Sequence, residues 1–319
     1  DLLETNKAID FWKTKNLDFS SIFQKPAESG LAVRCSTKQD HGIDKFFDVR
    51  LMDKVKDSIK NKKPVELELP ICNVDRTAGT MISNEIAKLY GSAGLPDDTI
   101  KAIFRGCAGQ SFGAFLAHGI TFTLVGESND YLGKGLSGGK IIVKPSEKAG
   151  YDASENTIAG NVLLYGATSG EVYINGQVGE RFAIRNSGAW AVIEGAGDHC
   201  CEYMTGGRIV VLGPVGVNFG AGMSGGLAYV YDETNTFDEF CNLSMVDLEQ
   251  IVVSEDIFEL RKMIETHFAL TGSRKARKIL DDWENSLQLF VKVFPMEYRK
   301  VLGQMMKEDE EIKRDVKQE

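Results

Sequence analysis

The sequence predicts a mainly β protein, a parallel β-helix, with a small α/β section before it and helices after it. The chain holds 33 glycines and only 7 prolines in 319 residues. The glycines return in a similar unit about every twenty residues, a period typical of stacked repeats. Each unit is followed by a short β-branched run with strand character. Together these observations favour a solenoid of short strands joined by glycine corners.

The repeated unit consists of an apolar residue, Ser or Thr, two glycines and a β run. "NDYLGKGLSGGKIIV" (129–143) matches "GVNFGAGMSGGLAYV" (216–230) almost position for position, and "GDHCCEYMTGGRIVV" (197–211) has the same ending. Looser copies lie at 109–122 and 179–192. The last glycine of each unit serves as its marker: Gly119, Gly139, Gly160, Gly188, Gly207 and Gly226.

The longest step, from Gly160 to Gly188, contains an extra short strand at 171–174. It is therefore either one coil with an insertion or two short coils. The leucine-rich frame L-x-x-L-x-L-x-x-N and a period of six are both absent, which leaves a single solenoid of about six to seven coils. We expect glycine at the corners because corners demand positive φ, where a Cβ is costly.

The glycines at 133, 135 and 138 also fit G-x-G-x-x-G, the dinucleotide-binding fingerprint. That motif binds a pyrophosphate only where it opens a helix. Here a strand-like run, 140–144, follows, and the motif returns at 220, 222 and 225. Recurring corners explain this recurrence better than recurring cofactors do.

The prediction divides the chain into four parts. Residues 1–45 form a linker or arm, 46–103 an α/β lead-in that covers the solenoid end, 104–232 the β-helix, and 233–319 a connection and C-terminal helices. Apolar spacing predicts helices at 46–61 and 80–91, and alternation predicts a strand at 64–71. After 233 we expect a helix capped by Ser254 and ended by Gly272, a second helix starting at Ser273, and a third at 296–315.

Composition excludes several classes of function. The net charge of −9 argues against a nucleic-acid partner, which needs a concentrated basic face. No apolar run approaches the length of a membrane span and no signal peptide leads the chain, so we expect no membrane partner. The six cysteines contain no C-x-x-C, which favours reduced thiols and an intracellular location, cytoplasmic or organellar. A first residue of Asp1 rather than Met suggests a piece of a longer protein.

The sequence offers no evident active site. The four histidines lie in unrelated contexts, and "GDHCCE" (197–202) is the best metal candidate. We reject it because adjacent residues of a strand point to opposite faces. Asp75-Arg76 can bind an anion or form a structural salt bridge, and Asp97-Asp98 reads as the start of a turn. We therefore expect no catalytic, cofactor-binding or metal-binding residue in this chain.

Several long segments resemble the C-terminal region of the glutamate synthase large subunit. The resemblance runs from about residue 31 to 305, and nine segments carry it. They are "QDHGID" (39–44), "LPDDTI" (95–100), "GCAGQSFGAFLAHGI" (106–120), "NDYLGKGLSGGKI" (129–141), "IAGNVLLYGATSGE" (158–171), the run 179–213, "NFGAGMSGGLAYVYDE" (218–233), "MVDLE" (245–249) and "FVKVFP" (290–295).

The resemblance implies a right-handed β-helix with a structural role. In that family an amidotransferase domain hydrolyses glutamine, and a flavin domain with FMN and an iron–sulfur cluster combines the ammonia with 2-oxoglutarate to give glutamate. This chain is then a scaffold that holds those two upstream domains in register, with no cofactor of its own. A nicotinamide-dependent reductase domain or subunit is a further implied partner. The alternatives are a β-helix subunit of another redox enzyme, similar to one in formylmethanofuran dehydrogenase, and a free-standing binding solenoid.

Overall fold

The computed structural model describes residues 10–23, 32 and 34–301. Two compact units appear, Asp1–Ile43 and Asp44–Glu319. In the first, the described part contains a turn and the short helix α1 (Ser20–Phe23). The second unit carries the sheet and the remaining helices.

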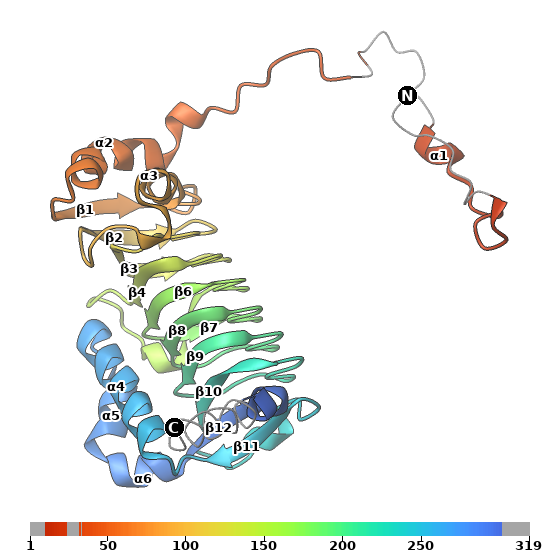
Figure 1. Cartoon of the computed structure of the whole chain (residues 1–319). Coiled ribbons are helices and arrows are strands. Elements are labelled where there is room, and N and C mark those ends of the chain that lie inside the picture. Colours follow the sequence, from red (N-terminus) through yellow and green to blue (C-terminus); the bar gives the residue numbers. More distant parts are fainter. Residues whose placement is uncertain (1–9, 24–31, 33, 302–319) are drawn as a thin grey trace, which may run out of the picture. The chain divides into compact units, whose positions relative to one another are not determined.

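The second unit is built on one open, largely parallel sheet, which has twelve strands in the described part of the chain. Its order is β1-β2-β3-β4-β6-β8-β9-β10-β12-β11, with β5 joined to β3 and to β7. Figure 1 shows the strands from β1 to β10 stacked one after another. The strands are β1 (Val65–Ile71), β2 (Ile100–Ala108), β3 (Ile120–Ser128), β4 (Ser137–Lys144), β5 (Thr157–Ala159), β6 (Ser169–Ile174), β7 (Gln177–Val178), β8 (Ser187–Ile193), β9 (Thr205–Val211), β10 (Gly225–Tyr231), β11 (Val246–Gln250) and β12 (Phe290–Pro295).

Helices lie at both ends of the stack. They are η2 (Ile43–Lys45), α2 (Phe47–Asn61), α3 (Thr80–Tyr90) and η3 (Gly91–Ala93) before the repeats, η4 (Ala153–Glu155) within them, and η5 (Phe237–Glu239), α4 (Ser254–Thr271), α5 (Arg274–Asp281) and α6 (Trp283–Gln288) after them. Figure 1 shows α2 and α3 at the β1 end and α4 to α6 beside the later strands. None of the described helices has the length and apolar character needed to span a bilayer.

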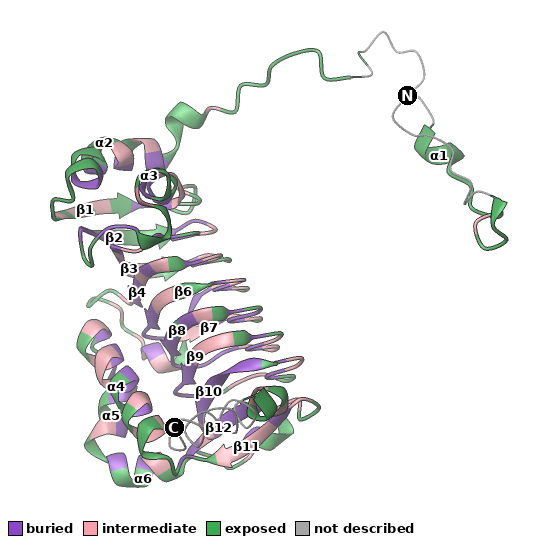
Figure 2. Ribbon diagram, viewed as in Figure 1, coloured by how far each residue is buried: buried purple, intermediate pink, exposed green. Residues whose placement is uncertain are grey.

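The core runs along the stack because equivalent positions of successive strands face inward. Phe104 of β2 pairs with Leu124 of β3, which pairs with Val143 of β4, and all three are fully buried. The rings of Phe104 and Phe122 lie 4.8 Å apart near the first repeat. Figure 2 shows this buried interior as a continuous purple column. Burying aliphatic and aromatic side chains in this way is the main source of stability.

Each repeat turns through a loop whose backbone alternates in handedness; we call these the alternating loops. Their first, third and fifth residues all have φ between 53° and 69°. They span residues 111–115, 131–135, 162–166, 181–185, 199–203 and 218–222. Positive φ is uncommon outside glycine and costs about 1–2 kcal/mol, yet most of these positions hold other residues.

Hydrogen bonds along the stack explain how these loops tolerate positive φ. In the loop 131–135, the N–H of Tyr131 donates to Asn161 O at 2.9 Å, and that of Gly135 donates to Tyr165 O at 2.8 Å, both in the next repeat. The N–H of Gly133 donates the opposite way, to Phe112 O at 2.9 Å. The amides of the first, third and fifth residues of this loop thus point alternately up and down the stack, and each is satisfied by a neighbouring repeat.

The glycines after Ser or Thr serve close approach more than positive φ. Gly188, Gly206 and Gly225 have no positive φ, but a Cβ on each would overlap a carbonyl oxygen of the preceding repeat. Our expectation that corner φ explains these glycines is therefore wrong at these positions. It holds at Gly207 and Gly226, which have φ of 89° and 77°.

The repeat phase also differs from the predicted one. Ser137 pairs with Ser169 and Lys140 with Glu171, so the glycine that follows Gly139 along the stack is Gly170 and not Gly160. Gly160 instead begins a second corner, shared with Gly179, Gly197 and Gly216, where each lies against the repeat before it. The predicted extra strand at 171–174 is β6, a full member of the stack, and the insertion lies between β4 and β5. The glycine pattern alone did not separate these two kinds of corner, because both carry glycine.

The predicted lead-in helices and strand are confirmed as α2, β1 and α3, and α3 ends at Gly91 as expected. Gly272 ends α4 in the left-handed conformation, and Ser273 caps α5, its Oγ accepting from Ala276 N. Ser254 is not a cap, because the N-cap of α4 is Val253. Residues 296–301 are helical, and the rest of the predicted third helix lies outside the described residues.

Candidate functional site

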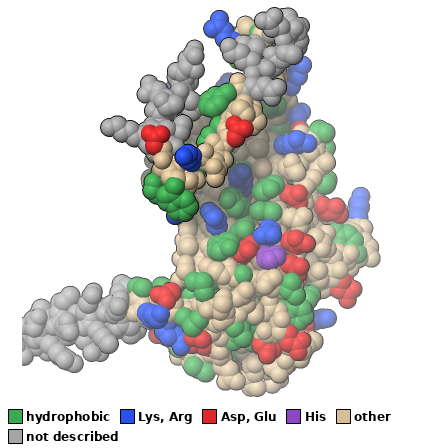
Figure 3. Space-filling view, turned by 90° about the vertical axis from the view of Figure 1, so that its right-hand side faces the viewer, with side chains coloured by type: hydrophobic (Ala, Val, Ile, Leu, Met, Phe, Trp, Pro, Cys, Tyr) green, Lys and Arg blue, Asp and Glu red, His purple; other side chains and the backbone are tan. Residues whose placement is uncertain are grey.

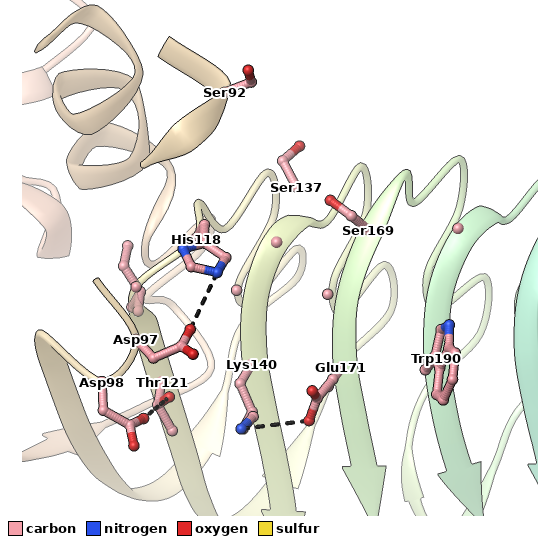
Figure 4. A pocket seen from close by; sticks show the side chains of 16 residues that line it. Ser92, Asp97, Asp98, His118, Thr121, Ser137, Lys140, Ser169, Glu171 and Trp190 are labelled. Carbon is pink, nitrogen blue, oxygen red and sulfur yellow. Dashed lines mark hydrogen bonds and ion pairs between the residues drawn. The ribbon is translucent and has the colours of Figure 1, made fainter. Parts of the chain in front are cut away.

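An open groove runs along the stack; we call it the glycine groove (Figure 4). Its volume is about 550 Å³. Gly138, Gly170 and Gly188, from consecutive strands of the sheet, form its floor. Because a Cβ at these positions would strike the neighbouring repeat, the floor stays flat. Ser137 and Ser169 line its rim as exposed hydroxyls.

One end of the groove carries an imidazole held between two acceptors. His118 Nδ1 lies 2.8 Å from Leu95 O, and its Nε2 lies 3.1 Å from Asp97 Oδ1. Both contacts are hydrogen bonds when both nitrogens carry protons. The neighbouring Asp98 accepts from Thr121 Oγ1 at 2.7 Å, and this bond lowers the pKa of Asp98. The predicted turn is confirmed, since Thr99 N donates to Pro96 O at 3.2 Å.

The floor of the groove continues into a file of paired side chains. Strands β3, β4, β6, β8 and β9 each contribute one residue to this file, and each member is the register partner of the next. The members are Thr121, Lys140, Glu171, Trp190 and Arg208. Figure 4 shows Lys140 pointing toward Glu171, and their charged atoms lie 3.4 Å apart. Arg208 lies with its guanidinium carbon 5.9 Å from the centre of the Trp190 ring.

The charges of this file are already matched within the chain. Arg208 donates to Glu259 of α4 at 2.6 Å, which ties the file to the helix that covers the later strands. Exposed ion pairs of this kind contribute roughly 0–1 kcal/mol each. The groove offers a polar surface that carries more carboxylates than lysines, with one exposed aromatic ring, Trp190, which is 40% exposed. It presents no nucleophile beside a free base.

A buried polar cluster lies between α4 and the end of the sheet. Tyr229 is fully buried, and its hydroxyl lies 3.3 Å from Asp256 Oδ1. Burial, followed by the nearby carboxylates, raises the pKa of Tyr229. Asp256 also accepts from Lys292 of β12 at 2.5 Å. Because each charge has a partner, this cluster fixes α4 against the strands.

A second buried pair joins α4 and α5 to β8. Glu194 is 1% exposed and accepts a hydrogen bond from Ser273 Oγ. His267 is fully buried, with Nε2 3.5 Å from Glu194 Oε1. Neither ring nitrogen of His267 makes a hydrogen bond within the described structure. The pair holds the C-terminal helices on the sheet without forming a solvent-accessible site.

The metal candidate of the sequence analysis is a structural loop. Cys200 and Cys201 are both buried, with Sγ atoms 3.8 Å apart. The expectation that their side chains diverge is wrong, because the segment is an alternating loop and not a strand; His199 and Cys201 both have positive φ. Glu202 accepts from Arg181 at 2.7 Å, which joins two successive loops. Within the described ranges, no three His, Cys, Asp or Glu side chains gather as metal ligands do.

The remaining candidate, Asp75-Arg76, has a structural role. Asp75 accepts from Cys72 N at 3.0 Å and lies 3.6 Å from Arg50 of α2. Its ion-pair partner is therefore Arg50 and not Arg76. All six cysteines are free. The face shown in Figure 3 carries acidic and basic side chains interspersed with hydrophobic ones; the expected lack of a nucleic-acid partner stays a prediction.

Sequence reasoning missed the glycine groove and its file of side chains. A signal was present in the repeat itself. Lys140, Trp190 and Arg208 each lie three residues after the Ser or Thr of their unit. Aligning the units on that residue places all three at one position of successive strands. Glu171 lies two residues after Ser169, because the register shifts there.

Comparisons of the sequence with known proteins match this chain to one family. The family model described as "GXGXG motif" matches residues 48–296. The chain is 50% identical over 302 residues to the glutamate synthase [NADPH] large chain of Bacillus subtilis (strain 168), covering 94% of this chain and 20% of that protein. It is 48% identical over 305 residues to the glutamate synthase [NADH] of Schizosaccharomyces pombe (strain 972 / ATCC 24843), covering 95% of this chain and 14% of that protein.

A third relative is the ferredoxin-dependent glutamate synthase 1, chloroplastic/mitochondrial, of Arabidopsis thaliana, which is 46% identical over 290 residues, or 90% of this chain and 18% of that protein. The chain thus spans about a fifth or less of the length of these relatives. The family model covers most of the sequence and includes every strand of the sheet. The chain therefore belongs to the GXGXG motif family, in the form found in glutamate synthase large chains.

Proposed function

We propose that this chain is a structural segment of a glutamate synthase polypeptide, and that its stacked strands and alternating loops are coils of a right-handed parallel β-helix. The observation that carries the proposal is the continuous parallel pairing along the path from β1 to β10, in which each strand and each alternating loop bonds to the next repeat. Such a stack resists bending because every repeat is joined to its neighbours by backbone hydrogen bonds and packed side chains.

The proposed role is that of a rigid spacer between upstream domains. The upstream amidotransferase domain and the flavin domain are the proposed partners within the same polypeptide, with a nicotinamide-dependent reductase as a further one. The names of the relatives support glutamate synthesis as the activity of the whole protein. We place the parent protein inside the cell, in the cytoplasm or an organelle.

The FMN and the iron–sulfur cluster belong, in this proposal, to those upstream domains. The described residues do not fit a cluster, which is held by several converging Cys thiolates. Cys200 and Cys201 adjoin, but among the described residues they belong to no group of three His, Cys, Asp or Glu that could hold a metal ion. We assign no catalytic, cofactor-binding or metal-binding residue to this chain. Its four parts, 1–45, 46–103, 104–232 and 233–319, are proposed as arm, end cover, β-helix and closing helices.

The end cover and closing helices fit this proposal because open coils expose sheet edges and apolar cores. Phe47 and Ile82, from α2 and α3, lie in the same core cluster as Phe104. At the other end, β12 pairs antiparallel with β10, which stops the parallel series. These elements give the first and last repeats partners within the same chain.

Removal of one repeat tests the spacer role. Ser187 and Thr205 occupy the same place in consecutive units, so deleting residues 188–205 joins Ser187 to Gly206, the residue that follows Thr205. The stack then shortens by about 4.8 Å. In the full-length polypeptide we expect glutamine hydrolysis and ammonia-dependent glutamate formation to survive separately, while transfer of ammonia between them falls.

The control is a deletion of equal design outside the stack, within the insertion 145–156, which leaves the spacing of the strands unchanged. Circular dichroism and thermal unfolding check that both variants fold. Undiminished coupling in a folded one-repeat deletion would contradict the spacer role. A flavin band in the purified 319-residue chain would contradict the assignment of FMN to an upstream domain.

A further inference from the structure

The described part of the first unit presents an unusual run of exposed apolar side chains. Within residues 10–23, the exposed fractions are 71% for Trp12, 68% for Ile22, 59% for Phe23, 53% for Phe11 and 51% for Phe19. A large apolar side chain left in water forgoes the favourable free energy that its burial would contribute. Single exposed residues are ordinary, but a gathered set marks an interaction site.

Local hydrogen bonds shape this segment, which we call the aromatic arm (residues 10–23), into two apolar groups. Thr14 N and Lys15 N both bond to Phe11 O, so the first turn brings the rings of Phe11 and Trp12 to one place, with centroids 6.1 Å apart. Asp18 Oδ1 accepts from Ser20 N at 2.9 Å and starts α1. The bends therefore present the rings in a defined order.

The second group lies on α1 itself. Ile22 N donates to Phe19 O at 2.9 Å, and Phe23 N donates to the same oxygen at 3.4 Å. Spacings of three and four place Phe19, Ile22 and Phe23 on one side of the helical turn. Aromatic anchors of this kind bury 150–250 Å² apiece, so the arm supplies enough apolar area for about half of a stable interface.

We propose that the aromatic arm is a docking segment that packs onto the preceding part of its own polypeptide. The inference rests on the proposed function, which treats the chain as one segment of a longer protein and places the other domains upstream. Two observations support this occupant. The relatives are five- to sevenfold longer than the matched segment, as the 20% and 14% coverage shows. The match covers 95% of this chain, so most of residues 1–43 lies inside it.

Charge argues against a lipid surface as the occupant. The arm carries Asp10 and Asp18 against Lys13 and Lys15, and therefore has no net charge. Interfacial membrane segments gain much of their affinity from a basic polar face over anionic lipid. A neutral aromatic segment fits a hollow on a folded protein, where Trp and Phe act as anchors.

Photocrosslinking in the full-length polypeptide tests the proposal. The change Trp12→p-benzoylphenylalanine places the probe in the arm, and Lys148→p-benzoylphenylalanine, at an exposed site in the insertion, is the matched control. We expect crosslinks from position 12 to peptides that precede this chain, at about tenfold the yield from position 148. A mixture of isotopically light and heavy protein separates contacts within one polypeptide from contacts between copies.

A second measurement does not depend on any substitution. We expect proteinase K to cleave within residues 10–23 about tenfold more slowly in the full-length polypeptide than in the 319-residue chain, because cleavage follows the exposed population. Equal cleavage rates, control-level crosslinking, or crosslinks only to a second copy or to lipid would each overturn the proposal. Neither readout measures ammonia transfer, so a spacer that fails the deletion test leaves this inference standing, and the reverse also holds.

Discussion

Gly206 lies directly against the carbonyl oxygen of Ser187 in the preceding repeat, and a Cβ on Gly206 would overlap that oxygen. The two residues are register partners in β9 and β8. The same relation joins Gly225 to Thr205 and Gly188 to Thr168. The Ser/Thr-Gly pattern therefore reflects a close contact between neighbouring repeats, which recurs in successive repeats.

This contact predicts an order of cost for glycine-to-alanine changes. Gly206→Ala introduces an overlap with backbone, and such overpacking costs about 1–3 kcal/mol. Gly166→Ala meets nothing within 4 Å but has φ of 61°, so it tests conformation alone, at about 1 kcal/mol. Gly150→Ala meets neither obstacle. Urea unfolding of the three variants should rank the loss of free energy of unfolding as Gly206, then Gly166, then Gly150. Equal losses at Gly206 and Gly150 would contradict the close-contact account.

Much of the fold was predictable because the repeat carries its own register. Period, Gly-Gly pairs and β-branched runs predicted β3, β4, β6, β8, β9 and β10 but not the short strands β5 and β7, and apolar spacing predicted α2 and α3. The phase failed at Gly160, because a sequence does not distinguish a glycine required for φ from one required for contact. Strands β11 and β12 were missed because their pairing joins segments distant in sequence, Val246 with Pro295. The local β-propensity of a segment does not tell which distant segment it will pair with.

The groove was harder to predict than the fold. Its floor is formed by glycines, which have no side chains, and its walls pair residues from different repeats, such as Lys140 with Glu171. Only a correct alignment of the units brings these residues together, and the error at Gly160 moved Glu171 out of phase. Likewise, His118 meets Asp97 through a loop closure that no periodic pattern describes.

Two serines at the starts of consecutive helices should respond differently to alanine. Ser273 Oγ accepts from Ala276 N at 2.9 Å and donates to the buried Glu194. Ser273→Ala removes a cap, worth about 1 kcal/mol, and leaves a buried carboxylate short of a donor, for about 1–3 kcal/mol more. Ser254→Ala, at the start of α4, removes no capping bond. Thermal unfolding should show a clear decrease in Tm for the first variant and almost none for the second; equal shifts would refute the assigned roles.

The six thiols should divide into two classes of reactivity. Cys35, Cys72 and Cys107 are exposed, whereas Cys200 and Cys201 are buried. Burial raises the pKa of Cys201, and it raises the pKa of Cys241 to about 12. Since the thiolate is the reactive form, a disulfide reagent at pH 8 should modify Cys35 and Cys72 quickly in the native chain, and Cys107 more slowly because desolvation raises its pKa. Cys200, Cys201 and Cys241 should react only after unfolding, as mass spectrometry of quenched samples will report. Rapid native labelling at Cys200 would mean that the loop 199–203 opens.

The carboxylate of Asp48 should make the stability of the chain depend on pH in an uncommon direction. Asp48 in α2 accepts from Gly79 N and from Met81 N, both at 2.7 Å, at the start of α3. It is 4% exposed, and desolvation raises its pKa in spite of these bonds. The folded state therefore keeps this proton to a higher pH than the unfolded state, whose Asp titrates near about 3.9.

The sign follows from proton linkage. As pH rises above about 4, the unfolded chain releases the proton first, so the contribution of Asp48 to the free energy of unfolding falls until the folded group also ionises. Subtracting the stability of Asp48→Asn from that of the parent, between pH 3 and pH 8, isolates this term, and the difference should decrease with pH. Asp98→Asn is the control of opposite sign, because its hydrogen bond with Thr121 lowers the pKa of Asp98. Its stabilising effect should be present above about pH 4 and lost as pH falls further. A difference for Asp48 that grows with pH would mean that the two amides of α3 outweigh burial at this carboxylate.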